Sequence, residues 1–248
     1  MPNHDRSTQP ALGILMLNTR FPRPPGDIGN PDTFSYAVDY AVIEPATVDR
    51  IVSAEGPSGR VMDAFVDAAH GLVDRGARGL TTSCGFMAIA QKELAGRCRV
   101  PVITSSLCQI PLVQASLPAG KRVGVLTIDS TQLTAAHFAG VGALTDLPIE
   151  GVEGGSELAR VIQNDLETLD VRKAEEDVID AGRRLLAKSP HVGAIVLECT
   201  NMAPYAKALA ETLRLPVYDI IGLLGWWRRS LEPPAFGERA PATTSTLG

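Results

Sequence analysis

The chain has 248 residues, of which 45% are hydrophobic and 21% are charged, so it can form one large globular domain or two small ones. Its formal net charge of −5 argues against a surface for nucleic acids, which would need clustered Lys and Arg. No apolar stretch approaches the roughly 20 residues that span a bilayer, and the N-terminus lacks the apolar core of a signal peptide. We therefore expect a cytoplasmic protein that binds neither nucleic acid nor membrane.

Short apolar runs alternate with amphipathic stretches through the middle of the chain. The apolar, β-branched runs predict strands at 12–17, 78–83, 100–104, 122–128, 192–198 and 215–218. The amphipathic stretches predict helices at 60–75, 86–96, 106–116, 131–141, 171–188, 202–213 and 220–230. This alternation is typical of α/β proteins with mainly parallel sheets flanked by helices, which bind ligands at the carboxyl ends of their strands.

Three further segments lack periodicity. Residues 1–10 and 233–248 are rich in Pro, Thr, Ala and Gly, which predicts disordered tails. Residues 20–35 follow the first strand and contain several Pro and Gly, which predicts a long loop over a cleft. Arg20 or Arg23 in this loop would either pair with a polar group of a substrate or be an ordinary surface arginine.

Two segments of the chain resemble each other over a strand, a cysteine, a helix and a second strand. The segment that begins Cys84-Gly85-Phe86-Met87-Ala88 matches the one that begins Cys199-Thr200-Asn201-Met202-Ala203, and the match extends without a gap to Pro101-Val102 and Pro216-Val217. A second correspondence links Gly13-Ile14-Leu15 with Gly124-Val125-Leu126. Leu, Ala and Pro-Val are common enough to recur by chance, but cysteine at the same junction in both copies favours a duplicated α/β unit.

A duplication predicts two pseudo-symmetric lobes whose strand-to-helix junctions face each other across a cleft. We expect lobe 1 to comprise residues 11–118 plus 218–232, and lobe 2 to comprise residues 119–217. Because Cys84 and Cys199 each precede a predicted helix, backbone N–H groups and the helix dipole are expected to lower the pKa of both thiols. A base and an acid on opposite sides of a carbon next to a carboxylate can remove its proton and return one to the other face.

Other kinds of chemistry have no support in the sequence. The histidines and cysteines do not fall at metal-ligand spacing, and no phosphate-binding loop or serine nucleophile motif is present, so we expect neither a metal nor an organic cofactor. The two remaining cysteines, Cys98 and Cys108, are interpreted as small hydrophobic residues.

Thr82-Ser83-Cys84-Gly85 and Glu198-Cys199-Thr200-Asn201-Met202 resemble the paired cysteine signatures of the aspartate/glutamate/hydantoin racemase superfamily, over nearly the whole chain. The resemblance implies two Rossmann-like lobes, an active site in the cleft between them, no cofactor, and a homodimer or higher homo-oligomer. It implies that Cys84 and Cys199 are the catalytic pair. The residues expected to bind substrate are Asn18, Thr82, Ser83, Gly85, Thr200 and Asn201.

The expected function is that of an isomerase, a cofactor-independent racemase or epimerase. It would act on the carbon next to the carboxylate or carbonyl of an amino acid, a hydantoin or a related acid. Many amino-acid racemases of the family have Cys-Asn-Thr and Cys-Thr-His, whereas this chain has Cys84-Gly85-Phe86 and Cys199-Thr200-Asn201. Phe86 and Met87 would either line a more apolar pocket or belong to the helix core. The alternatives are a maleate-type cis–trans isomerase, an arylmalonate-type decarboxylase, or a non-catalytic small-molecule binding protein.

Overall fold

The computed structural model describes residues 11–234, so the expected tail at 1–10 and most of the one at 233–248 lie outside the described part. Eight parallel strands form two sheets of four strands each. The first sheet has the order β2 (Val38–Ile43), β1 (Leu12–Leu17), β3 (Gly79–Thr82) and β4 (Val102–Ile103). The second has the order β6 (Ile149–Gly151), β5 (Arg122–Thr127), β7 (Val192–Leu197) and β8 (Val217–Tyr218). The two orders correspond strand for strand, and the predicted α/β fold with parallel sheets is confirmed.

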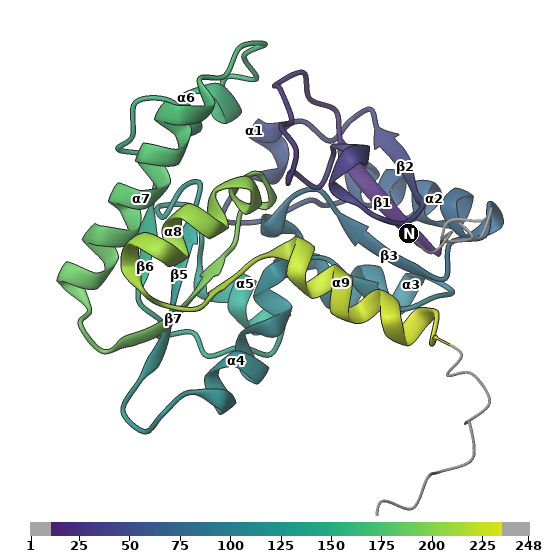
Figure 1. The fold of residues 1–248 in the computed structure, drawn as a ribbon. Helices are drawn as coiled ribbons and strands as arrows, with labels where there is room; N and C mark the ends of the chain where they lie inside the picture. Colours follow the sequence, from purple (N-terminus) through teal and green to yellow (C-terminus); the bar gives the residue numbers. More distant parts are fainter. Residues whose placement is uncertain (1–10, 235–248) are drawn as a thin grey trace, which may run out of the picture.

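Helices flank both sheets (Figure 1). The α-helices are α1 (Val48–Ile51), α2 (Arg60–Asp74), α3 (Gln91–Arg97), α4 (Ile110–Ser116), α5 (Ala135–Gly140), α6 (Leu158–Gln163), α7 (Val171–Lys188), α8 (Ala206–Leu213) and α9 (Ile220–Leu231). Four short 3-10 helices are η1 (Pro31–Thr33), η2 (Gly85–Ala90), η3 (Ser106–Gln109) and η4 (Thr200–Tyr205). Three of the predicted helices therefore begin as 3-10 turns, at η2, η3 and η4, and only later become α-helical.

Equivalent glycines bring one long helix close to each sheet. A Cβ on Gly13 of β1 would lie 3.1 Å from the Leu72 side chain of α2, and a Cβ on Gly124 of β5 would lie 2.8 Å from Leu185 of α7. Contacts this short leave no room for a side chain, so each glycine allows the helix to pack directly on the central strand. The second correspondence in the sequence thus reflects the same packing requirement in both sheets.

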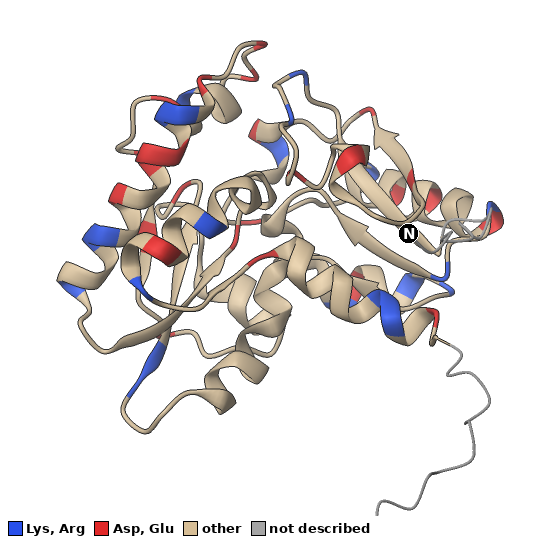
Figure 2. Cartoon of the chain, in the orientation of Figure 1, with Lys and Arg blue, Asp and Glu red and all other residues tan. Residues whose placement is uncertain are grey.

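The C-terminal helix α9 starts directly after β8 of the second sheet and packs against the first. Ile220, Leu224 and Trp227 belong to one buried cluster with Leu12 and Ile14 of β1. In Figure 1 this helix, drawn in yellow, runs from the second sheet across to the N-terminal one. In Figure 2 the ribbon segments coloured as acidic and as basic residues are interspersed along the chain. Within residues 11–234 no helix is long and apolar enough to cross a membrane.

Candidate active site

The two cysteines of the sequence repeat lie at equivalent places and line one cavity. Cys84 follows β3 and begins η2, while Cys199 follows β7 and begins η4. Both residues are at most 8% exposed. The cavity holds about 20 Å³, space for about one water molecule, and its lining is Leu17, Phe21, Val48, Val52, Ser83, Cys84, Gly85, Phe86, Ile128, Ile162, Glu198, Cys199 and Asn201.

The acidity of the two thiols differs from the sequence-based expectation. Burial, with a smaller contribution from the carboxylate of Glu198, raises the pKa of Cys84 to about 12, and the backbone N–H groups of Phe86 and Met87 oppose this shift only in part. Burial also raises the pKa of Cys199 well above its usual value, with Glu198 again adding to the effect. The expected lowering by helix N-termini is therefore outweighed, because the closed cleft removes water from the sulfur atoms.

The surroundings of the two sulfurs are nevertheless unequal. Cys84 is near the backbone N–H groups of Phe86 and Met87 and the positive charge of Arg23, all of which favour its thiolate. Cys199 instead donates its S–H to the amide oxygen of Asn201 at 3.5 Å, and the nearby charges of Cys84 and Asp27 raise its pKa. The backbone N–H of Asn201 lowers the pKa of Cys199 only in part, so Cys84, which has more groups that favour its thiolate, is the better candidate for the base.

Glu198 brings a carboxyl group to the same cavity. It is 0% exposed, and its Oε2 accepts a hydrogen bond of 2.8 Å from Thr127 Oγ1. Its Oε1 is buried and has no hydrogen-bond partner. Burial raises the pKa of Glu198 from its usual 4.5 to about 7, so the group changes charge near neutral pH.

Residues 18–34, which include most of the segment predicted as a loop at 20–35, contact residues of the second lobe. Asp27, which is 1% exposed, pairs with Arg23 at 2.9 Å. Its other carboxylate oxygen accepts a hydrogen bond of 2.6 Å from Asn201 of η4. Asn201 in turn accepts the S–H of Cys199, so the loop, Asn201 and this thiol form one chain of hydrogen bonds.

Arg20 fastens the same loop at a second point. Its guanidinium pairs with Asp165 at 3.2 Å and with Glu167 at 3.0 Å, both in the segment after α6. The Arg20 side chain is 67% exposed and does not line the cysteine cavity. The structure therefore engages both arginines of the loop in contacts with the protein itself.

The expected substrate-binding residues divide into two groups. Ser83, Gly85 and Asn201 line the cysteine cavity. Thr82 is buried with its hydroxyl 2.6 Å from the carbonyl oxygen of Thr104, and Thr200 donates to the carbonyl oxygen of Ser83 at 2.7 Å. Asn18 contacts Glu44 and lines a neighbouring surface pocket. Thr82, Thr200 and Asn18 thus position the backbone around the cavity in this closed form.

Glu198 and Asp27 are functional candidates to which the sequence analysis gave no role. Glu198 ends the apolar run Gly193-Ala194-Ile195-Val196-Leu197, and a charged residue at the end of a buried strand is the signal that could have identified it. Asp27 gave no such signal, because it lies in an irregular loop whose contacts depend on the tertiary fold.

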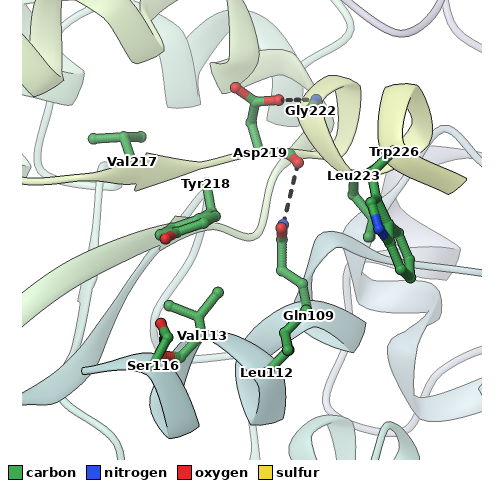
Figure 3. A pocket seen from close by; sticks show the side chains of 10 residues that line it. All are labelled: Gln109, Leu112, Val113, Ser116, Val217, Tyr218, Asp219, Gly222, Leu223 and Trp226. Atoms are coloured by element: carbon green, nitrogen blue, oxygen red, sulfur yellow. Dashed lines mark hydrogen bonds between the residues drawn. The ribbon is translucent and has the colours of Figure 1, made fainter. Parts of the chain in front are cut away.

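A larger groove than the cysteine cavity lies elsewhere, between α4 and α9 (Figure 3). It holds about 480 Å³ and is lined mainly by apolar side chains such as Leu112, Val113, Leu223 and Trp226. Its hydrogen bonds are internal: Gln109 donates to the backbone oxygen of Asp219, and the Asp219 carboxylate accepts from the backbone of Gly222. Within residues 11–234 no group of three His, Cys, Asp or Glu side chains is arranged to hold a metal ion.

Comparisons with known proteins agree with this arrangement. Residues 108–224 match the family described as Asp/Glu/Hydantoin racemase. The fold is similar to that of allantoin racemase from Klebsiella pneumoniae, with a TM-score of 0.60 and 18% identity over 89% of this chain and 87% of that one. It is also similar to a Gly74Cys mutant of arylmalonate decarboxylase, with a TM-score of 0.57 and 16% identity over 91% of this chain and 95% of the other.

Curated relatives with higher identity carry a different name. Dimethylsulfoniopropionate lyase of Durusdinium sp. clade D is 29% identical over 92% of this chain and 77% of its own length. Dimethylsulfoniopropionate lyases 3 and 7 of Emiliania huxleyi (strain CCMP1516) are 31% and 30% identical over 92% of this chain, which spans 62% and 69% of their lengths. The chain therefore belongs to the aspartate/glutamate/hydantoin racemase superfamily and is related to proteins named dimethylsulfoniopropionate lyases.

Proposed function

We propose that the chain is a cofactor-independent lyase that uses a cysteine thiolate to remove the proton next to a carboxylate and expels a leaving group from the adjacent carbon. The observation that carries this proposal is that the thiols of Cys84 and Cys199, from equivalent junctions of the two lobes, line one closed cavity. The names of the relatives support elimination as the outcome of proton removal, with dimethylsulfoniopropionate as the substrate.

The proposed reaction needs only one base. The Cys84 thiolate takes a proton from C2 of dimethylsulfoniopropionate, and the electron pair of that C–H bond forms the C2–C3 double bond. The C3–S bond breaks with its electron pair on sulfur, which releases dimethyl sulfide and leaves acrylate. The proton on Cys84 then passes to water. Polar groups at the two junctions, including Ser83 and Asn201, are proposed to hold the substrate carboxylate.

The high pKa of the Cys84 thiol in the closed cavity bears on this scheme. Desolvation dominates that shift, and a thiolate formed there is a strong base because little solvent stabilises it. A cavity of about 20 Å³ is smaller than any such substrate. The loop at 18–34 must therefore move to admit the substrate, and the proton of Cys84 is lost while the site is open to water.

Racemisation is the second candidate function. The supporting observation is that both thiols are present, since a two-base racemase needs one sulfur on each side of the reacting carbon. The solved racemase structures are under 25% identical to this chain and support its fold alone. A homodimer or higher oligomer also stays a proposal, which sedimentation of the purified chain would test.

The test is to incubate the purified chain with dimethylsulfoniopropionate and measure dimethyl sulfide in the gas phase and acrylate by NMR. We expect both products in equal amounts, and a loss of about 10²-fold or more in kcat for Cys84→Ser. Cys98→Ser is the matched control, because Cys98 does not line the cavity.

The alternative functions give different signals in the same NMR experiment. Exchange of a Cα proton of aspartate, glutamate or allantoin in D₂O, with no acrylate formed from dimethylsulfoniopropionate, would replace the lyase proposal with racemisation. Consumption of maleate or of a substituted malonate would indicate an isomerase or a decarboxylase.

A further inference from the structure

The carboxyl group of Glu198 lines the cavity beside the two thiols, and the proposed reaction does not use it. Its Oε2 accepts a hydrogen bond from Thr127 Oγ1, whereas its Oε1 is buried without a hydrogen-bond partner. A buried carboxylate oxygen without a hydrogen bond is unfavourable for the folded protein, because nothing compensates for its loss of hydration. A substrate group that pairs with Oε1 would offset this cost.

The charges around the cavity indicate what kind of group this is. Arg23 and Asp27 pair with each other at 2.9 Å and largely cancel. Ionised Glu198 then leaves one net negative charge beside Cys84 and Cys199, and this charge already raises the pKa of both thiols. A substrate that brings only carboxylates would add to this repulsion, whereas a substrate with a positive group would remove it.

The cavity wall also limits the chemistry of the positive group. Apart from the two thiols, Glu198, Ser83 and Asn201, its side chains are apolar, with Leu17, Phe21 and Ile162 among them. Ser83 Oγ already accepts from the backbone N–H of Leu17, and the Asn201 amide already binds Asp27 and Cys199. A cation covered with methyl groups fits such a wall, because it needs a nearby negative charge and no hydrogen-bond acceptors.

We propose that Glu198 is the residue that recognises the positive charge of the substrate, so that the site selects a zwitterion with one carboxylate and one methylated onium group. This inference rests on the proposed lyase function, whose substrate carries a dimethylsulfonium group. In this proposal the onium group lies against Oε1 of Glu198. Neutralising Glu198 in this way also removes the repulsion that disfavours the thiolate of Cys84.

The test uses two ligands of the same shape that differ in charge. 3-(Trimethylammonio)propionate carries a quaternary nitrogen where 4,4-dimethylpentanoate carries a quaternary carbon, and neither undergoes the elimination readily. By calorimetry we expect the wild type to bind the cationic ligand about tenfold to hundredfold more tightly. Glu198→Gln should reduce this preference to less than about threefold, while Glu211→Gln on the exposed surface of α8 keeps it.

A second measurement on the unaltered protein guards against a folding defect in Glu198→Gln. The ionisable groups that interact with Glu198 are Cys84 and Cys199, and these in turn are near Arg23 and Asp27 respectively. The pKa of Glu198 is about 7, so near that pH a bound cation should expel its proton, whereas the uncharged ligand should not. The number of protons released on binding is obtained by measuring the binding enthalpy in buffers of different ionisation enthalpy. Both ligands carry the same carboxylate and affect the cysteines equally, so the difference in proton release between them reports on Glu198.

The outcomes separate this inference from the lyase proposal. Cleavage of dimethylsulfoniopropionate together with an undiminished cation preference in Glu198→Gln would overturn the role of Glu198 and leave the lyase intact. A cation preference that depends on Glu198, without any cleavage, would support the recognition role and reject the lyase. Equal binding of both ligands by the wild type, with no difference in proton release, would overturn the inference outright.

Discussion

Gly85 shows how closely the two junctions approach each other. A Cβ at this position would overlap the backbone carbonyl oxygen and the Oε1 atom of Glu198. The φ angle of Gly85 is not positive, so the backbone conformation does not require glycine here. The lack of a side chain is what allows the close contact with Glu198. A residue with a side chain here would push apart the two halves of the cavity that contains the cysteines.

We therefore expect Gly85→Ala to lower both stability and activity. Overpacking at a rigid backbone contact typically costs about 1–3 kcal/mol, and the displaced Glu198 would alter the cavity beyond that. Urea unfolding and the kcat for dimethylsulfoniopropionate measure the two effects. Gly96→Ala is the matched control, since a Cβ on Gly96 meets nothing within 4 Å; equal behaviour of the two variants would show that the contact is not tight.

The cysteines themselves distinguish one-base from two-base chemistry. The proposed elimination uses the Cys84 thiolate as base and needs no acid, so we expect Cys199→Ser to retain more activity than Cys84→Ser. In a two-base racemase either substitution would stop turnover in both directions. Measuring kcat for the two variants in parallel distinguishes one-base from two-base chemistry. A larger loss of kcat in Cys199→Ser than in Cys84→Ser would assign the base to Cys199 instead.

At the level of elements, the loop at 18–34 is held closed by contacts with the second lobe. Arg20 reaches Asp165 and Glu167, and Asp27 reaches Asn201. Gly26 lies so near η4 that a Cβ on it would be 2.9 Å from Pro204 Cα. These contacts make the loop the element whose movement gives access to the thiols.

Arg20→Ala should accelerate alkylation of Cys84 and Cys199 by iodoacetamide. An exposed ion pair contributes about 0.2–1 kcal/mol, so loss of two pairs should raise the open population roughly twofold to thirtyfold. Arg172→Ala serves as control, because Arg172 pairs only with Glu176 of its own helix among the described ion pairs. Unchanged labelling in Arg20→Ala would mean that other contacts hold the loop in place.

The strands and helices next to the cysteines could be predicted because their apolar patterns are regular. β2 was missed because Val38–Ile43 is only half-buried and contains a charged Asp39. β6 was missed because it is three residues long and includes Glu150, which pairs with Arg184 and Lys188. The position of Cys84 and Cys199 in one cavity followed from the repeat, but their raised pKa did not, since burial depends on how the lobes close.

For the whole molecule, Glu198 links stability to pH. Its pKa in the folded protein is raised from 4.5 to about 7, so the folded protein keeps a proton that the unfolded chain releases between these values. Because the folded protein binds this proton more tightly, the contribution of Glu198 to the free energy of unfolding is fully present below the pKa of the unfolded chain. The contribution is lost as the pH rises through 7.

We expect the free energy of unfolding of the wild type, relative to Glu198→Gln, to fall by up to about 3 kcal/mol between pH 4.5 and pH 8. Urea unfolding of both proteins at several pH values measures the difference, in which the other ionisable groups cancel. A difference that does not vary with pH would show that Glu198 titrates alike in the folded and unfolded chains.

The chain crosses between the two sheets at two places, once between β4 and β5 and once between β8 and α9. A hydrogen bond connects the two crossings: Gln109, between β4 and β5, donates to the backbone oxygen of Asp219, between β8 and α9, at 3.1 Å. Such a double connection acts as a hinge: the lobes can rotate about it, but they cannot slide past each other. We therefore expect the lobes to open by rotation about this connection, with the cleft widening at the loop of residues 18–34, so that the proposed substrate would enter from that side.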